Sequence, residues 1–422
     1  MRLLYVIHQF FPDCHSGTEQ YCLAVAREAR RRGDDVTVLS LHWDHESEWQ
    51  PVRLFEQPYD GFRVLRLKHW QRINPNDVLR DYENLHLDGW FQRVLDQVRP
   101  DAVHFFHLRQ LGSNLIQVAK RSGARAVVNL MDFWYLCPRF TLLRSDQSLC
   151  GGPEGGASCI RCNHPELGGV QPMDGPAVLT SEPQARMRAL VDRPRRQLAN
   201  LAGADVVIAP SRFLVDMFAR NGFPRERMTV VPYGLEPDRV VAIPTKRLRR
   251  PLRLGFCGVM SPWKAPHLVV EAVHHSSMDV QLRVHGRTQE GAFQAYIDSM
   301  LASAAGDTRI HFPGAYSAAE AAQVFADMDV LVVPSVWYEN TPFVVLEAFA
   351  AGVPVIASDL GGLSEIIHHG ENGLLFVAGN VGSLRAAIDK IATDPDCFGS
   401  LRVAPPVGIV QNYDQFAAIY RR

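Results

Sequence analysis

The sequence predicts an α/β protein with two doubly wound parallel-sheet domains that face a cleft. Three observations carry this prediction: a length of 422 residues, an apolar fraction of 47%, and two separate series of alternating strand and helix patterns. At about 150 residues per domain, this length is enough for two or three domains. Charged residues make up 21%, so the composition is that of a globular chain with substantial cores.

The first series of strands and helices extends to about residue 240. It opens with an apolar strand over residues 3–11, which Pro12 ends, and a helix follows because Ser16-Gly17-Thr18-Glu19 has the spacing of a capping box. Gly33 ends that helix before the next apolar run. Further strands are predicted at residues 36–40, 62–67, 101–106, 126–130 and 205–208, and helices at 90–98 and 111–121.

A second series begins after a basic stretch that two prolines enclose, PTKRLRRP at residues 244–251, which we expect to be an exposed linker. The domains are therefore predicted at 1–240 and 251–400. A closing amphipathic helix is expected within 406–422. In the second domain, strands are predicted at 252–259, 280–286, 310–314, 329–335 and 353–358, and helices at 266–273, 292–304, 318–328 and 342–351.

The charge balance excludes several classes of partner. Lys and Arg number 44 and Asp and Glu number 45, a formal net charge of −1, so no global field favours nucleic acid. No apolar run reaches the roughly 18 residues that a membrane span needs, and no signal peptide is visible at the N-terminus. The eight cysteines are few for this length, so we expect a cytoplasmic location.

The most informative stretch is residues 330–362, where a strand ends in a polar loop and a helix begins inside that loop. Thr341 is predicted as the N-cap, Pro342 as the first helical residue, and Gly352 as the stop signal. The backbone amides of Phe343 and Val344 then lie at the positive end of a helix dipole. That position suits a phosphate or a sugar oxygen.

Two glutamates flank this helix start. Glu339 lies in the loop, and Glu347 lies in a run, residues 343–351, that is otherwise apolar on every face. A single Glu is usually a solvated surface residue, but a charge within an apolar helix is costly without a partner. The pair suits a ligand with hydroxyl groups at both ends and phosphate in the middle.

The segment ENTPFVVLE, followed by AGVPVIAS and a Gly-Gly loop, resembles the donor site of the family 4 retaining glycosyltransferases. The resemblance extends over nearly the whole chain. It implies the GT-B fold, with two Rossmann-like domains and a C-terminal helix that returns to the N-terminal domain. The other matching segments are the opening pattern of His8, Pro12, Ser16, Gly17 and Glu19, then MDFWYLCPR at 131–139, VVPYGLE at 230–236 and GVMSPWK at 258–264.

The resemblance also implies roles for particular residues. Glu339 would contact the donor sugar, Glu347 the ribose of the nucleotide, and Lys264 the diphosphate. An ammonium beside the diphosphate would stabilise the negative charge that grows as the glycosidic bond breaks. We therefore expect Glu339, Lys264 and Asp132 to be the catalytic residues, and the donor-binding residues to be Gly17, Lys264, Asn340, Thr341, Pro342, Phe343 and Glu347.

Two positions depart from the family pattern. Many members carry Arg directly after the glycine of the strand-end motif, where this chain has Val259, and many carry His before the mid-domain Asp, where it has Met131. Arg287 is a candidate to replace the missing phosphate contact. These departures motivate an alternative function, a non-catalytic subunit that binds a nucleotide sugar.

A cysteine-rich insert at about residues 137–165 is the second informative cluster. Cys159 and Cys162 have the C-x-x-C spacing of metal ligands, and Cys137 and Cys150 would complete a set of four. Four thiolates fit a structural Zn site, and an iron–sulfur cluster uses the same ligands. Free thiols or a disulfide are the alternatives.

The sequence thus predicts a retaining hexosyltransferase-type enzyme that needs no catalytic cofactor. The metal-like motif Asp327-Met328-Asp329 precedes a strand instead of following one, so we interpret it as the end of a helix. The expected partners are a UDP- or GDP-type sugar donor and a carbohydrate or lipid-linked acceptor. The basic runs 193–196 and 246–250 are interpreted as solvated faces, with peripheral membrane contact as the alternative role.

Overall fold

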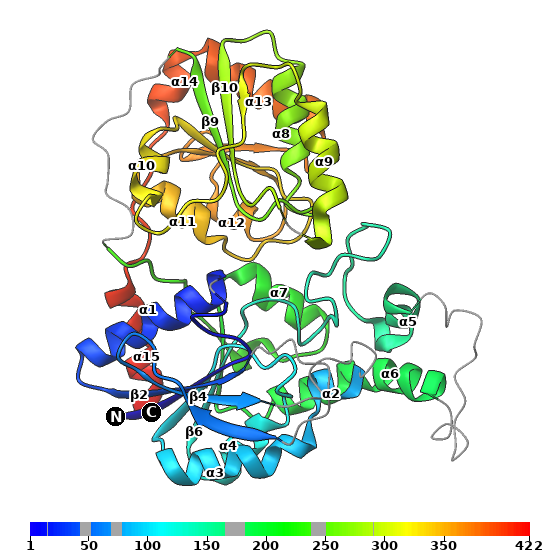
Figure 1. Cartoon of the computed structure of the whole chain (residues 1–422), viewed down its shortest axis with the longest axis vertical. Coiled ribbons are helices and arrows are strands. Elements are labelled where there is room, and N and C mark those ends of the chain that lie inside the picture. The colour runs from blue at the N-terminus through cyan, green and yellow to red at the C-terminus, as the bar shows by residue number, and fades with distance from the viewer. Residues whose placement is uncertain (15, 43–51, 69–77, 165–181, 238–249, 290) are drawn as a thin grey trace. The chain divides into compact units, whose positions relative to one another are not determined.

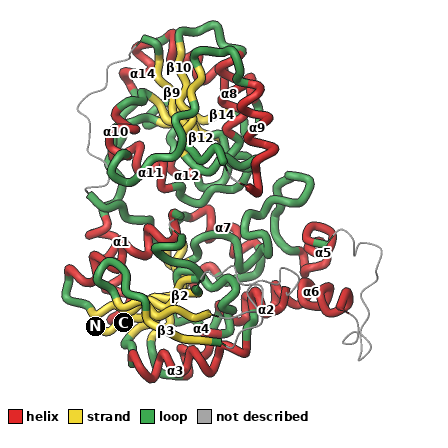
Figure 2. Tube along the Cα trace, in the orientation of Figure 1, coloured by secondary structure: helices red, strands yellow, loops and turns green. Residues whose placement is uncertain are grey.

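The protein is described by a computed structural model that covers residues 1–14, 16–42, 52–68, 78–164, 182–237, 250–289 and 291–422. The chain forms two units (Figures 1 and 2). Unit 1 comprises Met1–Tyr233 and Ile409–Arg422, and unit 2 comprises Gly234–Gly408. Most of the predicted linker, residues 244–249, lies outside the described residues.

The described part of unit 1 contains a sheet of eight strands in the order β3-β4-β2-β1-β5-β6-β7-β8. All neighbours are parallel except β3 and β4, which pair antiparallel at one edge. The strands are β1 (Arg2–Ile7), β2 (Asp35–Leu41), β3 (Arg53–Glu56), β4 (Arg63–Lys68), β5 (Ala102–Phe105), β6 (Arg125–Asn129), β7 (Val206–Ala209) and β8 (Met228–Val230).

The helices of unit 1 include α1, whose predicted capping box is confirmed. The Ser16 backbone N–H donates to Glu19 Oε2 at 2.6 Å, and Gln9 Nε2 donates to Oε1 of the same carboxylate at 3.1 Å. The helices are α1 (Gly17–Arg31), α2 (Val78–Tyr82), α3 (Asp88–Val98), α4 (Leu115–Arg121), α5 (Ala157–Asn163), α6 (Glu182–Leu201), α7 (Arg212–Arg220) and α15 (Ile409–Arg421).

The described part of unit 2 contains a parallel sheet in the order β11-β10-β9-β12-β13-β14. Its strands are β9 (Leu252–Cys257), β10 (Val280–His285), β11 (Ile310–His311), β12 (Val330–Val333), β13 (Val355–Ser358) and β14 (Gly373–Phe376). Its helices are α8 (Pro266–His274), α9 (Gln294–Ser303), α10 (Ala321–Ala326), α11 (Phe343–Ala350), α12 (Leu363–Ile366), α13 (Val381–Thr393) and α14 (Pro395–Ser400).

Side chains alternate between the two faces of the unit 2 sheet, as the period of a strand requires. In β12, Val330 and Val332 join the core beneath α8, α9 and α13, whereas Leu331 and Val333 join the core beneath α10, α11 and α12. Each face is therefore covered by helices, and the predicted doubly wound architecture is confirmed. Among the described helices, none is both long and apolar enough for a membrane span.

The closing helix α15 packs within unit 1, so the predicted return of the C-terminal helix is confirmed. Its Asn412 Oδ1 accepts from Tyr21 Oη of α1 at 2.9 Å, and Tyr420 Oη lies 2.6 Å from His104 Nδ1 of β5. Phe416 and Tyr420 are buried, and each such side chain contributes about 1.5–3 kcal/mol of stability.

The buried imidazole of His104 makes the stability of unit 1 depend on pH. Burial lowers the pKa of His104 from 6.5 to about 3, so the folded protein keeps it neutral while the unfolded chain binds a proton. The free energy of unfolding therefore falls as the pH drops below 6.5, by about 1.4 kcal/mol per pH unit, until the pH reaches about 3. Urea unfolding between pH 6.5 and 5 should show this slope in the wild type and in Tyr420→Phe. His104→Asn should flatten it, and equal slopes in wild type and His104→Asn would contradict this assignment.

Candidate functional site

The order of the strands in unit 2 locates its candidate site. From β9 the chain proceeds through β10 and β11 to one side and then returns to β12 on the other side, so the direction reverses between β9 and β12. Ligands of open parallel sheets bind beyond the carboxyl ends of the strands at such a reversal. Lys264 follows β9 and Glu339 follows β12, which places both predicted residues at this point.

Lys264 and Glu339 form a direct ion pair in which Lys264 Nζ lies 2.6 Å from Glu339 Oε1. The Glu339 side chain is 5% exposed and the Lys264 side chain 24% exposed. Lys264 precedes the N-terminus of α8, where the positive helix dipole disfavours a cation unless an anion lies close by. Glu339 supplies that anion.

Two further donors reach the same oxygen of Glu339. Ser335 Oγ donates to Oε1 at 2.7 Å, and Trp337 Nε1 donates to it at 2.8 Å. Trp337 also presents its ring to Lys264, whose Nζ lies 5.3 Å from the ring centroid. Our sequence analysis did not predict Ser335 or Trp337 as site residues, although both lie in the loop that follows β12.

Backbone contacts join the loops that carry these side chains. The Val336 N–H donates to Trp263 O at 2.9 Å, which joins the loop after β12 to the loop after β9. The Gly362 N–H donates to Glu339 O at 2.7 Å, which adds the loop after β13. A Cβ atom at Gly362 would lie 1.7 Å from Asn340 O, so only glycine permits this approach.

Helix α11 begins one residue later than predicted. Phe343 is its first residue and Pro342 is the N-cap, so the assignment of Thr341 as N-cap was wrong. The reason is local: the Pro342 carbonyl accepts from the Val345 N–H, and Pro342 has extended backbone angles. The Thr341 hydroxyl is buried, and the described residues provide no hydrogen-bond partner for it.

Glu347 lies inside α11 and is 4% exposed. The pKa of the thiol of Cys257, the last residue of β9, is raised to about 12, mainly by burial and also by the charge of the Glu347 carboxylate. Asn340 is also buried, in the loop that carries Glu339. The residues predicted to bind the donor in unit 2, from Lys264 to Glu347, therefore gather around the ends of β9 and β12.

Unit 1 has a corresponding cluster at its own reversal point, between β1 and β5. His107 follows β5 and its Nε2 lies 3.1 Å from Asp132 Oδ2, while the His8 ring centroid lies 4.3 Å from that of His107. The Arg109 N–H donates to His107 Nδ1, so the ring proton lies on Nε2 and is donated to Asp132. The Trp134 N–H donates to Asp132 Oδ1 at 2.7 Å.

Sequence reasoning missed His107. Its signal is a polar residue directly after the predicted strand at residues 101–106. The predicted residues Asp132 and Gly17 also follow strands of this sheet, β6 and β1 respectively. Gly17 is the first residue of α1.

The two departures from the family pattern lie at the ends of strands. Val259 follows β9 and is 52% exposed, so no core contact explains its side chain. Met131 follows β6, and its sulfur accepts from Tyr233 Oη at 3.5 Å. Arg287, the candidate replacement for a phosphate contact, is exposed in the loop after β10. This loop touches the loop after β9, since a Cβ at Gly286 would lie 2.4 Å from Gly258 O.

The aspartates of the Asp327-Met328-Asp329 motif lie between α10 and β12, as predicted. Asp329 is buried, and its Oδ1 accepts from Arg253 Nη2 at 2.9 Å. The Arg253 backbone N–H donates to Asp329 Oδ2 at 3.0 Å. These contacts give Asp329 a structural role that joins β12 to β9.

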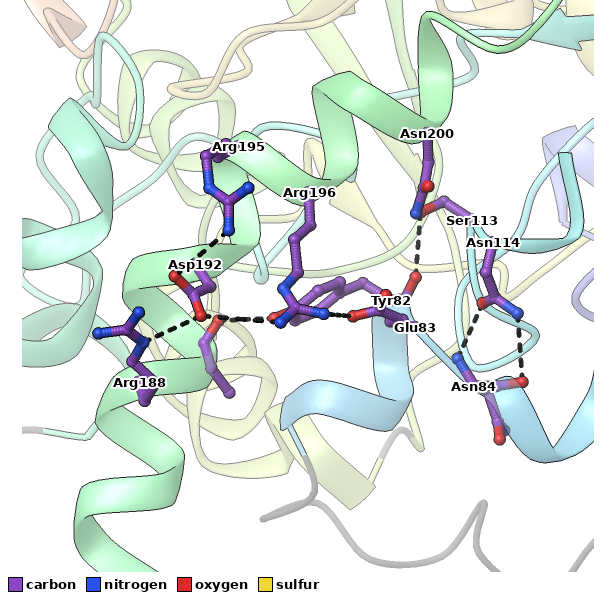
Figure 3. A network of polar contacts seen from close by, with 11 residues as sticks. Tyr82, Glu83, Asn84, Ser113, Asn114, Arg188, Asp192, Arg195, Arg196 and Asn200 are labelled. Carbon is purple, nitrogen blue, oxygen red and sulfur yellow. Dashed lines mark hydrogen bonds and ion pairs between the residues drawn. The ribbon is translucent and has the colours of Figure 1, made fainter. Parts of the chain in front are cut away.

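The prediction that the basic run 193–196 is a solvated face was wrong for Arg193, which is 1% exposed. Its guanidinium donates to the Trp134 carbonyl and lies 4.0 Å from Asp81. Figure 3 shows the neighbouring part of α6, where Arg196 forms an ion pair with Glu83 and approaches Asp192. The second basic run lies outside the described residues except for Arg250.

None of the eight cysteines, all of which lie in the described residues, forms a disulfide. Within the described ranges, no group of three or more His, Cys, Asp or Glu side chains is arranged to hold a metal ion. A short hairpin brings Cys150 back toward Cys137, because the Cys150 N–H donates to Leu142 O at 2.8 Å. Cys159 and Cys162 lie on α5.

Two Rossmann-like units with candidate ligand groups at their strand ends define the GT-B class. Comparison with known proteins then identifies the family. The profile of Glycosyltransferase Family 4 matches residues 15–239, more than half of the chain, and that of Glycosyl transferases group 1 matches residues 251–394. The chain belongs to glycosyltransferase family 4.

Curated relatives carry several activities. A GDP-mannose-dependent alpha-mannosyltransferase of Mycolicibacterium smegmatis is 26% identical over 413 residues, 94% of this chain and 91% of the relative. A D-inositol 3-phosphate glycosyltransferase of Stackebrandtia nassauensis is 32% identical over 199 residues, 43% of this chain. The matched region spans only 44% of the length of that second relative.

Solved structures share the fold at low sequence identity. Anabaena HepE, solved in complex with UDP and glucose, superposes with a TM-score of 0.67 at 17% identity and covers 100% of this chain and 99% of its own. A sucrose-phosphate synthase from Thermosynechococcus elongatus superposes with a TM-score of 0.68 at 17% identity, over 99% and 98% of the two chains.

Proposed function

We propose that the protein is a retaining glycosyltransferase that moves a hexose from a nucleotide-diphosphate sugar to an acceptor hydroxyl. The observation that carries this proposal is the Lys264–Glu339 pair at the reversal point of the unit 2 sheet, with the buried Glu347 in the adjoining helix. A buried carboxylate, a cation and a helix N-terminus provide groups for ribose, diphosphate and sugar.

In the proposed mechanism Lys264 stabilises the diphosphate as it leaves, when its negative charge is largest. The first amides of α11 support the same charge, and Glu339 orients the sugar. The departing phosphate accepts the proton of the acceptor hydroxyl as the new glycosidic bond forms on the same face of the sugar. Asp132, held by His107 and the Trp134 amide, is proposed to be a catalytic residue, and Gly17, at the start of α1, a donor-binding residue.

The donor is proposed to be of the UDP or GDP type, because relatives with either kind exist. The mannosyltransferase relative is described as dependent on GDP-mannose, and HepE was solved with UDP. We propose a carbohydrate or lipid-linked acceptor and a cytoplasmic location. The exposed Arg188 and Arg195 of α6 are candidates for contact with an anionic lipid headgroup.

A panel of UDP- and GDP-sugars tests the proposal. We expect one nucleoside diphosphate to raise the melting temperature and the matching sugar donor to release that nucleotide when an acceptor is present. A ligand at 100 times its Kd adds about 2.7 kcal/mol of stability. Transfer should persist in EDTA, since no protein group of the proposed mechanism acts through a metal. Binding without any nucleotide release would favour the alternative suggested by Met131 and Val259, a non-catalytic nucleotide-sugar-binding subunit.

We also propose that Cys137, Cys150, Cys159 and Cys162 hold a structural Zn ion or an iron–sulfur cluster. The pKa of Cys159 is raised to about 12, mainly by burial and also by the thiols of Cys137, Cys150 and Cys162. The buried Arg193 lies in the same neighbourhood, and its Nε and Nη1 have no hydrogen-bond partner among the described residues. A metal–thiolate group is negatively charged and would balance this cation.

Freshly reduced protein is expected to contain about one Zn, or a cluster's equivalent of iron, per chain. The double variant Cys159→Ser/Cys162→Ser should lose the metal and unfold at a lower temperature, because the four-thiolate site then keeps only two ligands. Cys397→Ser, a cysteine of unit 2, is the control and should keep the metal. Elemental analysis that finds neither metal in the wild type would exclude this site.

A further inference from the structure

The carboxylate of Glu339 has an asymmetric set of contacts. Lys264 Nζ, Ser335 Oγ and Trp337 Nε1 all approach Oε1, at 2.6, 2.7 and 2.8 Å. A carboxylate oxygen has two lone pairs, so three donors saturate Oε1. None of these contacts involves Oε2, which is therefore the oxygen that can accept from a ligand hydroxyl.

We propose that Trp337 and Ser335 are positioning residues of the transfer reaction: their donors hold Oε1 of Glu339 so that Oε2 faces the donor sugar. This inference rests on the proposed function of the same site. Trp337 has a second task, because its ring lies against the Lys264 ammonium and favours the cation at the place where the diphosphate binds. One side chain thus sets the position of both charged groups.

Preorganisation explains why two neutral donors matter beside a lysine. When the diphosphate binds, it competes with Glu339 for the Lys264 ammonium, and Glu339 can lose its strongest partner. The hydroxyl of Ser335 and the indole N–H of Trp337 are uncharged, so a phosphate attracts them less strongly than it attracts the Lys264 ammonium. They therefore keep the Glu339 carboxylate in place. Hydrogen bonds to an ionised group are stronger than those between neutral groups, which suits this role.

The position of Trp337 supports a functional role over a purely structural one. Its side chain is half-buried in a loop, not in either hydrophobic core of unit 2. Trp263 provides a matched comparison, because it lies beside Lys264 and its ring packs against that of Phe293, with the centroids 4.9 Å apart. The same substitution at Trp263 leaves the Glu339 contacts intact.

The test compares Trp337→Phe, Trp337→Leu and Ser335→Ala with the control Trp263→Phe. Calorimetry would measure the affinity for UDP and for UDP-glucose, and for GDP and GDP-mannose. For the nucleotide that binds, the ratio of the affinity for the sugar donor to the affinity for the free nucleoside diphosphate measures the contribution of the sugar. We call this ratio the sugar increment. In Trp337→Phe and Ser335→Ala we expect this sugar increment and kcat to fall by about 10- to 100-fold, the usual effect of a lost hydrogen bond to a charged group.

Affinity for the nucleoside diphosphate alone separates the two tasks of Trp337. Trp337→Phe keeps an aromatic ring beside Lys264 and should bind the nucleoside diphosphate as the wild type does. Trp337→Leu removes the ring and should weaken that affinity by several-fold as well. Trp263→Phe should behave as the wild type in every measurement.

A wild-type sugar increment in both Trp337→Phe and Ser335→Ala would overturn the proposal. The proposed function fails in a different way, namely as an absence of transfer in the wild type with any donor. Because the sugar increment is a binding measurement, it still decides the role of Trp337 and Ser335 in that case. Loss of UDP and GDP affinity in all variants, with altered circular dichroism, would instead show a merely structural role.

Discussion

Replacing Lys264 with alanine is expected to lower turnover by about 10²- to 10³-fold while unit 2 remains folded. The reason is that its ammonium is most valuable when the diphosphate carries the charge of a leaving group, and loss of one such group costs about 2.7 to 4 kcal/mol. The side chain is partly exposed, so its removal leaves no large cavity. Steady-state rates with saturating donor would measure the effect.

Two controls make the Lys264 result interpretable. Lys264→Arg keeps a cation beside Glu339 and should retain more activity than the alanine variant. Lys390→Ala removes an exposed lysine in α13 of the same unit and should leave turnover unchanged. Unchanged turnover in Lys264→Ala would place the diphosphate site elsewhere in the protein.

The second large effect separates the two glutamates. Glu347→Gln should weaken binding of both the free nucleoside diphosphate and the whole donor by about 10- to 100-fold, because the ribose contact is lost in each. Glu339→Gln should not weaken the nucleoside diphosphate affinity, whereas transfer falls and discrimination between sugar epimers weakens. A site built around a substrate hydroxyl loses selectivity when its acceptor is altered.

Calorimetry with the nucleoside diphosphate, together with initial rates for two epimeric donors, decides between these outcomes. Glu339 also pairs with Lys264, so Glu339→Gln releases that ammonium. The effects of Glu339→Gln and Lys264→Ala should therefore not be additive in a double variant. Equal losses of nucleotide affinity in both single variants would show that the two roles are misassigned. Wild-type behaviour in both would remove the main support for glycosyl transfer.

Much of the fold was predictable because the strands of unit 2 are buried and apolar on both faces. In a run such as the one within residues 329–335, successive positions are apolar because both faces of a parallel strand are covered by helices. The edge strand β3 was not predicted, since only four residues pair there and three of them are exposed. Its pairing depends on β4, which no local pattern reveals.

The candidate site was predictable where residues lie in one motif or at the end of a strand. Glu339, Glu347 and the start of α11 belong to a single stretch of chain, and Lys264 follows β9. The His107–Asp132 contact joins residues 25 positions apart, and only the sheet order brings them together. Likewise, the sequence does not show that three donors share one oxygen of Glu339.

Arg193 shows the limit of reasoning from charge alone. A run of four residues with three arginines has the composition of a solvated surface, yet one guanidinium is buried against Trp134 and Tyr82. The helix α6 places successive side chains about 100° apart, so neighbours in a run can face opposite environments. The pattern of hydrophobic neighbours, not the charge, decides which one is buried.

The chain enters and leaves unit 2 at adjacent points: Leu235 pairs with Gly408, and the Leu235 N–H donates to Val407 O at 3.0 Å. Unit 2 is therefore a continuous insertion in the chain of unit 1, and only the last helix of unit 1, α15, follows it. Unit 2 precedes α15 in the chain, so the core of unit 1 is complete only when Tyr413, Phe416 and Tyr420 of α15 have been added. Exchange of unit 2 between relatives needs only one pair of neighbouring junctions, so such an exchange would test the proposed assignment of the donor site to unit 2.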